Sequence, residues 1–477
     1  MVAQYLTPSR GKGDSVYLQL YRRYREAIAS GKLKPGDRVP SVRSLASELN
    51  LARGTVESAY GMLTSEGYFV ARGAAGTIVS PRLRNLRDPG KAKVVANPER
   101  ESLRSPHASL GVALPFQLGL PALDAFPRKV WARLAGRNVR TLETAAMTAP
   151  DPAGYMPLRD AIATYLGISR GITCSPQQVF VTTGYRGALE LVCRTLLRAG
   201  DQGWFEDPGY INARWCLECA GMRLTPVPVD EEGLDVGAGE RRAPLARFAV
   251  VTPTHQSPTS VALSLPRRLE LLDWARRNRA WIIEDDYDSE FRYHGRPLPA
   301  LKCLDRDERV LYSGTFSKVL FPGLRLAYLV VPASQVGKFQ DMAYNLSGSG
   351  SILRQAMVAD FIEQGHFARH LRKMRTLYGK RHGYLVDALV QTYGDRVQVQ
   401  PQVGGMHVLA RLKHPQDDKA LAAAAHAQGF PVHALSNWRM RKGKDSGLLM
   451  GFANFATPEE ALASVRRLKA ALQDLDD

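Results

Sequence analysis

The sequence predicts an α/β protein in two parts, a small helical module at the N-terminus and a large domain built on a mostly parallel β-sheet. Three observations support this prediction. The chain has 477 residues, more than a single core of about 100 to 200 residues usually contains. Apolar residues recur every three to four positions in the first 65 residues. Beyond residue 115, β-like apolar runs alternate with helical patterns.

Composition is that of an ordinary globular protein. Apolar residues make up 45% of the chain and charged residues 23%, and no apolar run approaches the roughly 20 residues that cross a bilayer. The first 15 residues lack the apolar segment of a secretion signal, so we expect a cytoplasmic protein without membrane contact. The odd count of five cysteines argues against a disulfide framework, and we expect no metal site.

Positive charge is concentrated near the N-terminus. Residues 1 to 115 contain 18 Lys or Arg against 9 Asp or Glu, a net charge of +9 out of +18 for the whole chain. A basic module of this kind favours a polyanionic partner, and nucleic acid is the first candidate.

The N-terminal module, residues 12–80, has the pattern of a helix-turn-helix followed by a hairpin. Residues 16–30 form one amphipathic pattern, Ser41 is suited to cap a second, and residues 53–66 form a third after a short break. Two β-like pieces, 68–70 and 77–79, enclose the glycine-containing ARGAAG, which predicts a wing. Residues 81–115 are rich in Pro, Arg and Ser, which predicts a flexible basic linker.

Several residues of this module have positions suited to contact DNA. The start of the second helix of a helix-turn-helix meets base edges in the major groove, and here it carries Arg53, Gly54 and Thr55. Arg43 lies on the outward face of the preceding helix, and Arg72 at the wing tip.

The run PGDRVPSVRSLASELNLARGTVESAYGMLTSEGYFVARGAAGT resembles the winged-helix module of the GntR family of bacterial regulators. The resemblance covers residues 16–80. It implies DNA contacts from Ser41, Arg43, Arg53 and Thr55, and from the wing.

The large domain, residues 116–477, has β-like runs at 179–183, 248–252, 280–284 and 310–314, separated by helical patterns. This alternation predicts a sheet covered by helices on both faces. A long helical pattern at 351–390 belongs to a smaller C-terminal subdomain that we expect from about residue 335.

Polar residues follow the predicted strands, where ligands of open α/β sheets bind. Gly184 precedes a helix that begins near Tyr185 and Arg186, which suits a phosphate, and Tyr210 could stack on a flat heterocycle. The carboxylate of Asp285 could keep the nitrogen of a pyridine ring protonated.

The same segment leaves one alternative open, because Asp285 and Asp286 could instead bind Mg²⁺, although no Walker sequence accompanies them. Tyr287 follows and could hydrogen-bond a phenolic oxygen. About thirty residues later, Thr315, Ser317 and Arg325 suit a phosphate, and Lys318 suits an aldehyde.

The order of these pieces, with TPTHQSPTS, EDDYDSEF and SGTFSK in sequence, resembles the fold type I aminotransferases. The resemblance runs from about residue 115 to the C-terminus. It implies pyridoxal 5'-phosphate as cofactor, bound as an internal aldimine at Lys318. It also implies that Asp285 contacts the ring nitrogen, Tyr287 the ring hydroxyl and Arg325 the phosphate.

The fusion of the two parts resembles the MocR type of GntR regulators, which includes PdxR-like and GabR-like proteins. This implies a head-to-tail homodimer that binds double-stranded operator DNA and senses pyridoxal phosphate or an amino compound. A working aminotransferase with a DNA-binding extension remains the alternative, and so does a structural remnant without cofactor.

Three positions depart from the aminotransferase pattern. Ser257, beside Gln256, replaces an Asn that contacts the ring hydroxyl, and Arg186 stands where Gln is frequent. Leu449 replaces the Arg that grips a substrate carboxylate, which favours a sensor, or a ligand held by another arginine such as Arg214 or Arg439.

Overall fold

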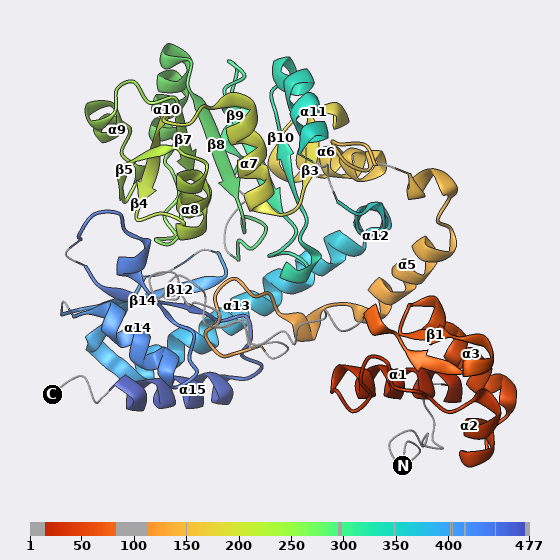
Figure 1. The fold of residues 1–477 in the computed structure, drawn as a ribbon. Helices are drawn as coiled ribbons and strands as arrows, with labels where there is room; N and C mark the ends of the chain where they lie inside the picture. The colour runs from red at the N-terminus through yellow and green to blue at the C-terminus, as the bar shows by residue number, and fades with distance from the viewer. Residues whose placement is uncertain are drawn as a thin grey trace. The chain divides into compact units, whose positions relative to one another are not determined.

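A computed structural model describes residues 15–82, 113–148, 150–293, 298–346, 350–400, 402, 404–414, 416–443 and 445–472. The chain divides into two compact units, Met1–Pro106 and His107–Asp477, and Figure 1 shows their elements. Most of the linker that we predicted over 81–115 lies outside the described residues.

The N-terminal unit is a winged helix-turn-helix, as the sequence predicts. Its helices are α1 (Val16–Ala29), α2 (Val42–Glu48) and α3 (Arg53–Ser65), and its wing is the antiparallel pair β1 (Phe69–Ala71) and β2 (Thr77–Val79). The observed bounds lie within two residues of the predicted ones. A 3-10 turn, Gly73–Ala75, joins the two strands of the wing.

Three aromatic rings form the centre of this unit. Tyr24, Tyr60 and Phe69 meet edge to face, with centroids 5.1 to 5.6 Å apart. The two tyrosine hydroxyls are 2.9 Å apart, and Tyr60 Oη donates to Pro40 O at 2.9 Å. Because this buried hydroxyl is satisfied, the helices and the wing are joined by specific contacts as well as by apolar area.

In the described part of the chain, eight strands form the main sheet of the C-terminal unit, in the order β3-β10-β9-β8-β7-β4-β5-β6. Their bounds are β3 Val179–Thr182, β4 Gln202–Asp207, β5 Arg223–Asp230, β6 Gly233–Leu234, β7 Phe248–Val251, β8 Trp281–Asp286, β9 Val310–Thr315 and β10 Ala327–Val330. β5, β4, β7, β8 and β9 are parallel, and β10 is antiparallel to both of its neighbours. The predicted mostly parallel sheet is confirmed.

Helices cover both faces of this sheet (Figure 1). Alternate residues of each strand point to opposite faces. Phe248 and Val250 pack with helices α7, α8 and α11, whereas Ala249 and Val251 pack with α9 and α10. The bounds of these helices are α7 Tyr185–Leu196, α8 Ile211–Cys219, α9 Val236–Arg242, α10 Leu265–Asn278 and α11 Val336–Asn345. Trp204 of β4 stacks on Trp274 of α10, with centroids 3.8 Å apart.

At the β3 end of the sheet, a third apolar cluster joins the sheet to the C-terminal part of the chain. Val179 and Val181 of β3 belong to it, with residues of α6 (Met156–Arg170) and α12 (Ile352–Glu363). Helix α5 (Arg128–Arg140) packs against α12.

The C-terminal part contains a second, antiparallel sheet. Among the described residues its order is β11-β12-β14-β13, with bounds β11 Val397–Val399, β12 His407–Leu412, β13 His433–Ala434 and β14 Gly447–Gly451. Helices α14 (Asp418–Ala427) and α15 (Pro458–Leu472) accompany it, and α15 packs against α13 (His366–Tyr393).

The helical pattern at 351–390 is two helices and not one. Gly365, at a φ of +70°, interrupts the helical backbone between α12 and α13. None of the helices in the described ranges is long and apolar enough to span a membrane.

Candidate cofactor and DNA sites

The carboxyl ends of five strands meet at one edge of the main sheet. β4, β7, β8 and β9 are parallel neighbours, and β3 runs in the same direction because β10 is antiparallel to both β3 and β9. The predicted cofactor residues follow these ends: Gly184 after β3, Tyr210 after β4, Asp285 and Tyr287 at the end of β8, and Lys318 after β9. The topology therefore collects residues that are up to 134 positions apart in the sequence.

The side chain of Lys318 is half-buried, and its amine has a hydrogen-bond acceptor. Its Nζ donates to Gly119 O at 3.0 Å. Gly119 has a φ of +69°, which favours glycine, and a Cβ there would lie 2.1 Å from Nζ, so a larger residue would push the end of the lysine side chain aside. Burial lowers the pKa of Lys318, and the nearby carboxyls of Asp288 and Asp285 partly offset this. A lysine in this state supplies a neutral, nucleophilic amine at lower pH than an exposed lysine does.

Asp285 and Asp286 are adjacent in β8 but have different surroundings. Asp286 accepts from Tyr312 Oη at 2.6 Å and pairs with the Arg170 guanidinium at 3.2 Å, and all three side chains are buried. Asp285 lies on the site side, where burial raises the pKa of its carboxyl to about 8. Asp286 therefore supports the fold, whereas the Asp285 carboxyl, which interacts with Tyr185, has no ion pair in the described part of the chain.

A histidine without a predicted role contacts Tyr287. His255 Nδ1 lies 3.1 Å from Tyr287 Oη and 3.1 Å from each carboxylate oxygen of Asp288. Sequence reasoning missed both His255 and Asp288, although both stand inside motifs that were singled out, THQSPTS and DDYDSEF. The spacing of these residues in the sequence does not predict their contact, because the contact depends on β7 and β8 being neighbours in the sheet.

The predicted phosphate residues lie around the start of α7. Gly184 precedes this helix at a φ of +89°, and a Cβ there would lie 4.0 Å from the guanidinium carbon of Arg325. Arg325 is exposed and has a φ of +51°. Ser317 N donates to Thr315 Oγ1 at 3.1 Å, which tightens the turn before Lys318. An Arg beside the free N–H groups of a helix start is a favourable place for a phosphate.

The aromatic residues of the site lie close together. The ring centroids of Tyr185 and Tyr210 are 6.2 Å apart, and those of Tyr210 and Trp438 are 5.7 Å apart. Arg186 is exposed and donates to Asn212 Oδ1 at 2.6 Å, and Asn212 in turn donates to Tyr210 Oη at 3.0 Å. Arg186 thus supports the tyrosine through Asn212.

The structure also shows the surroundings of Gln256, the neighbour of Ser257, and of Leu449. The Gln256 amide donates to Glu206 Oε2 at 3.0 Å and to Pro208 O at 2.8 Å, so it fastens its turn to the end of β4. Leu449 is fully buried in an apolar cluster with Leu409 and Trp438, against which Leu118 and Tyr210 pack.

The two arginines suggested as substitutes for the missing one are already engaged. Arg439 pairs with Asp445, and Arg214 donates to the backbone oxygen of Arg439 at 3.1 Å. Each arginine thus has a contact within the protein, and its role toward a ligand stays a prediction.

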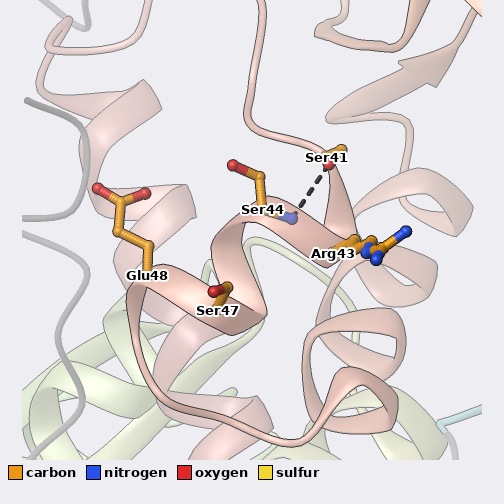
Figure 2. Close-up of a pocket in the computed structure, with 5 residues that line it drawn as sticks. All are labelled: Ser41, Arg43, Ser44, Ser47 and Glu48. Atoms are coloured by element: carbon orange, nitrogen blue, oxygen red, sulfur yellow. Dashed lines mark hydrogen bonds between the residues drawn. The ribbon is translucent and has the colours of Figure 1, made fainter.

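In the N-terminal unit, Ser41 and Arg43 line a hollow at the start of α2. Ser44 N donates to Ser41 Oγ at 3.1 Å, which caps the helix as predicted. Figure 2 shows this bond, with the Arg43 side chain projecting from the helix. Ser44, Ser47 and Glu48 complete the lining.

The remaining predicted DNA residues lie on α3 and the wing. Arg53 and Gly54 are exposed at the start of α3, with Thr55 half-buried, and Arg72 is exposed at the wing. Arg53 pairs with Glu57 at 2.9 Å, a contact between two exposed side chains that costs little to break. Arg38, which was not predicted, is exposed beside the wing: a Cβ on Gly76 would lie 3.1 Å from its guanidinium.

Known protein families match both units of the chain. Residues 16–79 match the family of bacterial regulatory proteins, gntR family, and residues 126–437 match aminotransferase class I and II. The probable rhizopine catabolism regulatory protein MocR of Rhizobium meliloti is 36% identical, over 96% of this chain and 94% of that protein.

The chain belongs to the MocR-type subfamily of GntR regulators. Two further MocR-type relatives extend over nearly the same length. The pyridoxine biosynthesis transcriptional regulator PdxR of Corynebacterium glutamicum is 34% identical over 92% of each chain, and the transcriptional regulator TauR of Rhodobacter capsulatus is 32% identical over 90% of each. This MocR-type protein is thus a DNA-binding transcription regulator.

Solved structures similar to the C-terminal unit include several aminotransferases. LysN, the α-aminoadipate aminotransferase of Thermus thermophilus, solved with N-(5'-phosphopyridoxyl)-L-leucine, has a TM-score of 0.69 and 29% identity, covering 80% of this chain and 96% of that one. The kynurenine aminotransferase of Pyrococcus horikoshii has a TM-score of 0.71 at 24% identity, covering 83% and 100%, which shows the shared fold. The MocR-type regulator therefore has a fold type I aminotransferase-like domain, a fold whose members depend on pyridoxal phosphate.

Proposed function

We propose that this regulator binds pyridoxal 5'-phosphate at Lys318 and that occupancy of this site by the cofactor, or by an amine attached to it, sets the affinity for operator DNA. The observation that carries the proposal is the half-buried amine of Lys318, which lies against Gly119 and close enough to Asp285 for the carboxyl to affect its pKa. When bound, pyridoxal phosphate supplies an aldehyde to which amines attach reversibly.

The residues of the site fit this cofactor. Gly119 leaves open space beside the amine, and Gly184 opens a helix start beside the Arg325 guanidinium, where a phosphate would bind. The Asp285 carboxyl would accept a hydrogen bond from the ring nitrogen, and Tyr287 would donate to the ring hydroxyl. Tyr210 would stack on the ring.

The apolar cluster around Leu449 supports sensing over turnover. Without an arginine at that position, a substrate carboxylate has no bidentate partner there. A transaminase needs such a partner because it must orient its substrate in every catalytic cycle. A sensor needs only that two states differ in their affinity for DNA.

We further infer that the regulator acts as a head-to-tail homodimer on double-stranded DNA, as the family resemblance implies. Ser41, Arg43, Arg53, Gly54, Thr55 and Arg72 would contact the operator. Light scattering of the purified protein should give twice the mass of one 52.6 kDa chain; a single-chain mass would contradict this part of the proposal.

The decisive test is the visible absorbance of the protein after addition of pyridoxal phosphate. The wild type should gain a band that borohydride fixes, and peptide mapping should locate the fixed group on Lys318. Lys318→Ala should lack the band. Lys338→Ala, which changes an exposed lysine, is the matched control and should keep it.

Mapping matters because burial also lowers the pKa of Lys302, which makes it a second candidate for the reaction. A fixed group on Lys302, or no band in the wild type, would refute the proposed role of Lys318.

The regulatory half is tested on a site selected by the wild type from random duplex DNA. Its affinity should change when pyridoxal phosphate or a candidate amine is added, and Lys318→Ala should not respond. Identical affinities with and without these compounds would contradict the coupling. Turnover of amino acid and keto acid without DNA would favour the alternative, a working aminotransferase.

A further inference from the structure

His255 is a buried histidine in the loop after β7, with one ring nitrogen in a three-way contact. Its side chain is 8% exposed. Nδ1 lies 3.1 Å from both oxygens of Asp288 and 3.1 Å from Tyr287 Oη. A carboxylate accepts hydrogen bonds and cannot donate them, so Nδ1 carries the proton and His255 donates from this side.

This assignment decides the role of the Tyr287 hydroxyl. With the hydrogen of Nδ1 directed between Asp288 and Tyr287, the tyrosine oxygen accepts, and its own hydrogen is free to point elsewhere. Burial, together with the charge of Asp288, raises the pKa of Tyr287 well above its usual value, and a hydrogen bond with Ser257 acts in the opposite direction. Tyr287 therefore stays protonated and remains a donor.

The ring of His255 is held on its other side as well. A Cβ on Gly405 would lie 2.1 Å from His255 Cε1, so the backbone of Gly405 packs directly against the ring. Gly405 N donates to Phe291 O at 2.9 Å, which fixes this contact. Nε2 is buried and has no hydrogen-bond partner among the described residues, so only the Nδ1 side makes directional contacts.

We propose that His255, held by Asp288 and Gly405, is a positioning residue that directs the Tyr287 hydroxyl toward the ring oxygen of pyridoxal phosphate. This rests on the proposed function above. The proposal also accounts for Ser257 in place of an Asn. The ring oxygen then has one donor, the Tyr287 hydroxyl, and the imidazole of His255 orients this hydroxyl.

The test compares two amide substitutions that place a nitrogen at different points. Asn at position 255 retains a donor near Nδ1, whereas Gln reaches toward Nε2. His255→Asn should therefore bind pyridoxal phosphate as the wild type does. His255→Gln should bind it roughly threefold to tenfold more weakly, the usual effect of one lost hydrogen bond, and should shift the pH midpoint of the visible band.

Tyr287→Phe completes the experiment as a double-mutant cycle. It should show the same weakening and the same pH shift as His255→Gln, and the double variant should be no worse than Tyr287→Phe alone. His407→Asn is the matched control. This histidine is also buried, its ring centroid is 5.8 Å from that of His255, and it bonds to Pro258 O. Its spectrum should match the wild type.

Equal behaviour of His255→Asn and His255→Gln would overturn the proposal, and so would additive effects of the His255 and Tyr287 changes. These outcomes differ from a failure of the proposed function, because the variants are compared only after the wild type has shown the Lys318 absorbance band. A wild type without this band would refute the cofactor site itself.

Discussion

Replacing Asp285 with Asn should make the cofactor-free protein more stable, and increasingly so as the pH rises. Burial raises the pKa of the Asp285 carboxyl from 3.8 to about 8. The folded state therefore holds a proton that the unfolded chain has already released, and the stability of the wild type falls as the pH rises between these two values. Asn mimics the protonated carboxyl and does not titrate.

The size of the effect follows from the same pKa. Over the three pH units from 5 to 8, about 1.36 kcal/mol per unit gives a ceiling of about 4 kcal/mol. Water that enters the site screens the charge, so we expect the advantage of Asp285→Asn to grow by about 2 kcal/mol over this range. Glu206 and Glu284, whose pKa values burial raises to about 7, are present in both proteins, so the comparison isolates the change at Asp285 together with its interaction with Glu206.

Urea unfolding of the stripped protein, followed by tryptophan fluorescence at pH 5, 6.5 and 8, measures this difference. Asp341→Asn changes an exposed carboxyl and should track the wild type at each pH. Parallel curves for the wild type and Asp285→Asn would refute the reasoning, since Asp285 would then already be ionised in the folded state. Pyridoxal phosphate should flatten the wild-type curve, because a cationic ring nitrogen stabilises the carboxylate.

Three further outcomes are expected. Arg43→Ala should weaken binding to all duplexes and reduce the slope of log affinity against log salt by about one; an unchanged slope in a salt titration would exclude a phosphate contact. Arg170→Met should destabilise the C-terminal unit by about 3 to 5 kcal/mol, because it leaves buried Asp286 unpaired, and calorimetry that showed no loss would contradict this. Tyr60→Phe should cost about 1 kcal/mol in the winged helix through its lost bond to Pro40, with DNA affinity as the check that the fold is intact.

The overall fold was predictable because both halves carry strong periodic patterns. Strand β8 reads as an apolar run that ends in charge, and α1, α2 and α3 read as three amphipathic helices with clear breaks. The division of one long helical pattern at Gly365 was not foreseen, because a glycine within a helix is often tolerated and its positive φ depends on the packing of α12 and α13.

The candidate site was predictable where a residue immediately follows a strand, as Lys318 and Asp285 do. It was not predictable where the partner lies on another strand or in another part of the unit. The contact of His255 with Tyr287 needs β7 and β8 to be neighbours, and the contact of Gly119 with Lys318 joins positions 199 residues apart. No local pattern encodes either distance.

The bond from Lys318 to Gly119 has a consequence for how a signal could leave the site. An amine that is attached to another molecule has fewer hydrogens to donate, so the cofactor proposed at Lys318 would compete with the carbonyl of Gly119 for the same nitrogen. Gly119 lies on the stretch that leads back along the chain to the DNA-binding unit, and Phe116 on the same stretch is tied to Gly451 of β14 by a backbone bond of 2.8 Å. If Lys318 takes up the cofactor as proposed, the first change would therefore fall on a backbone carbonyl of this stretch.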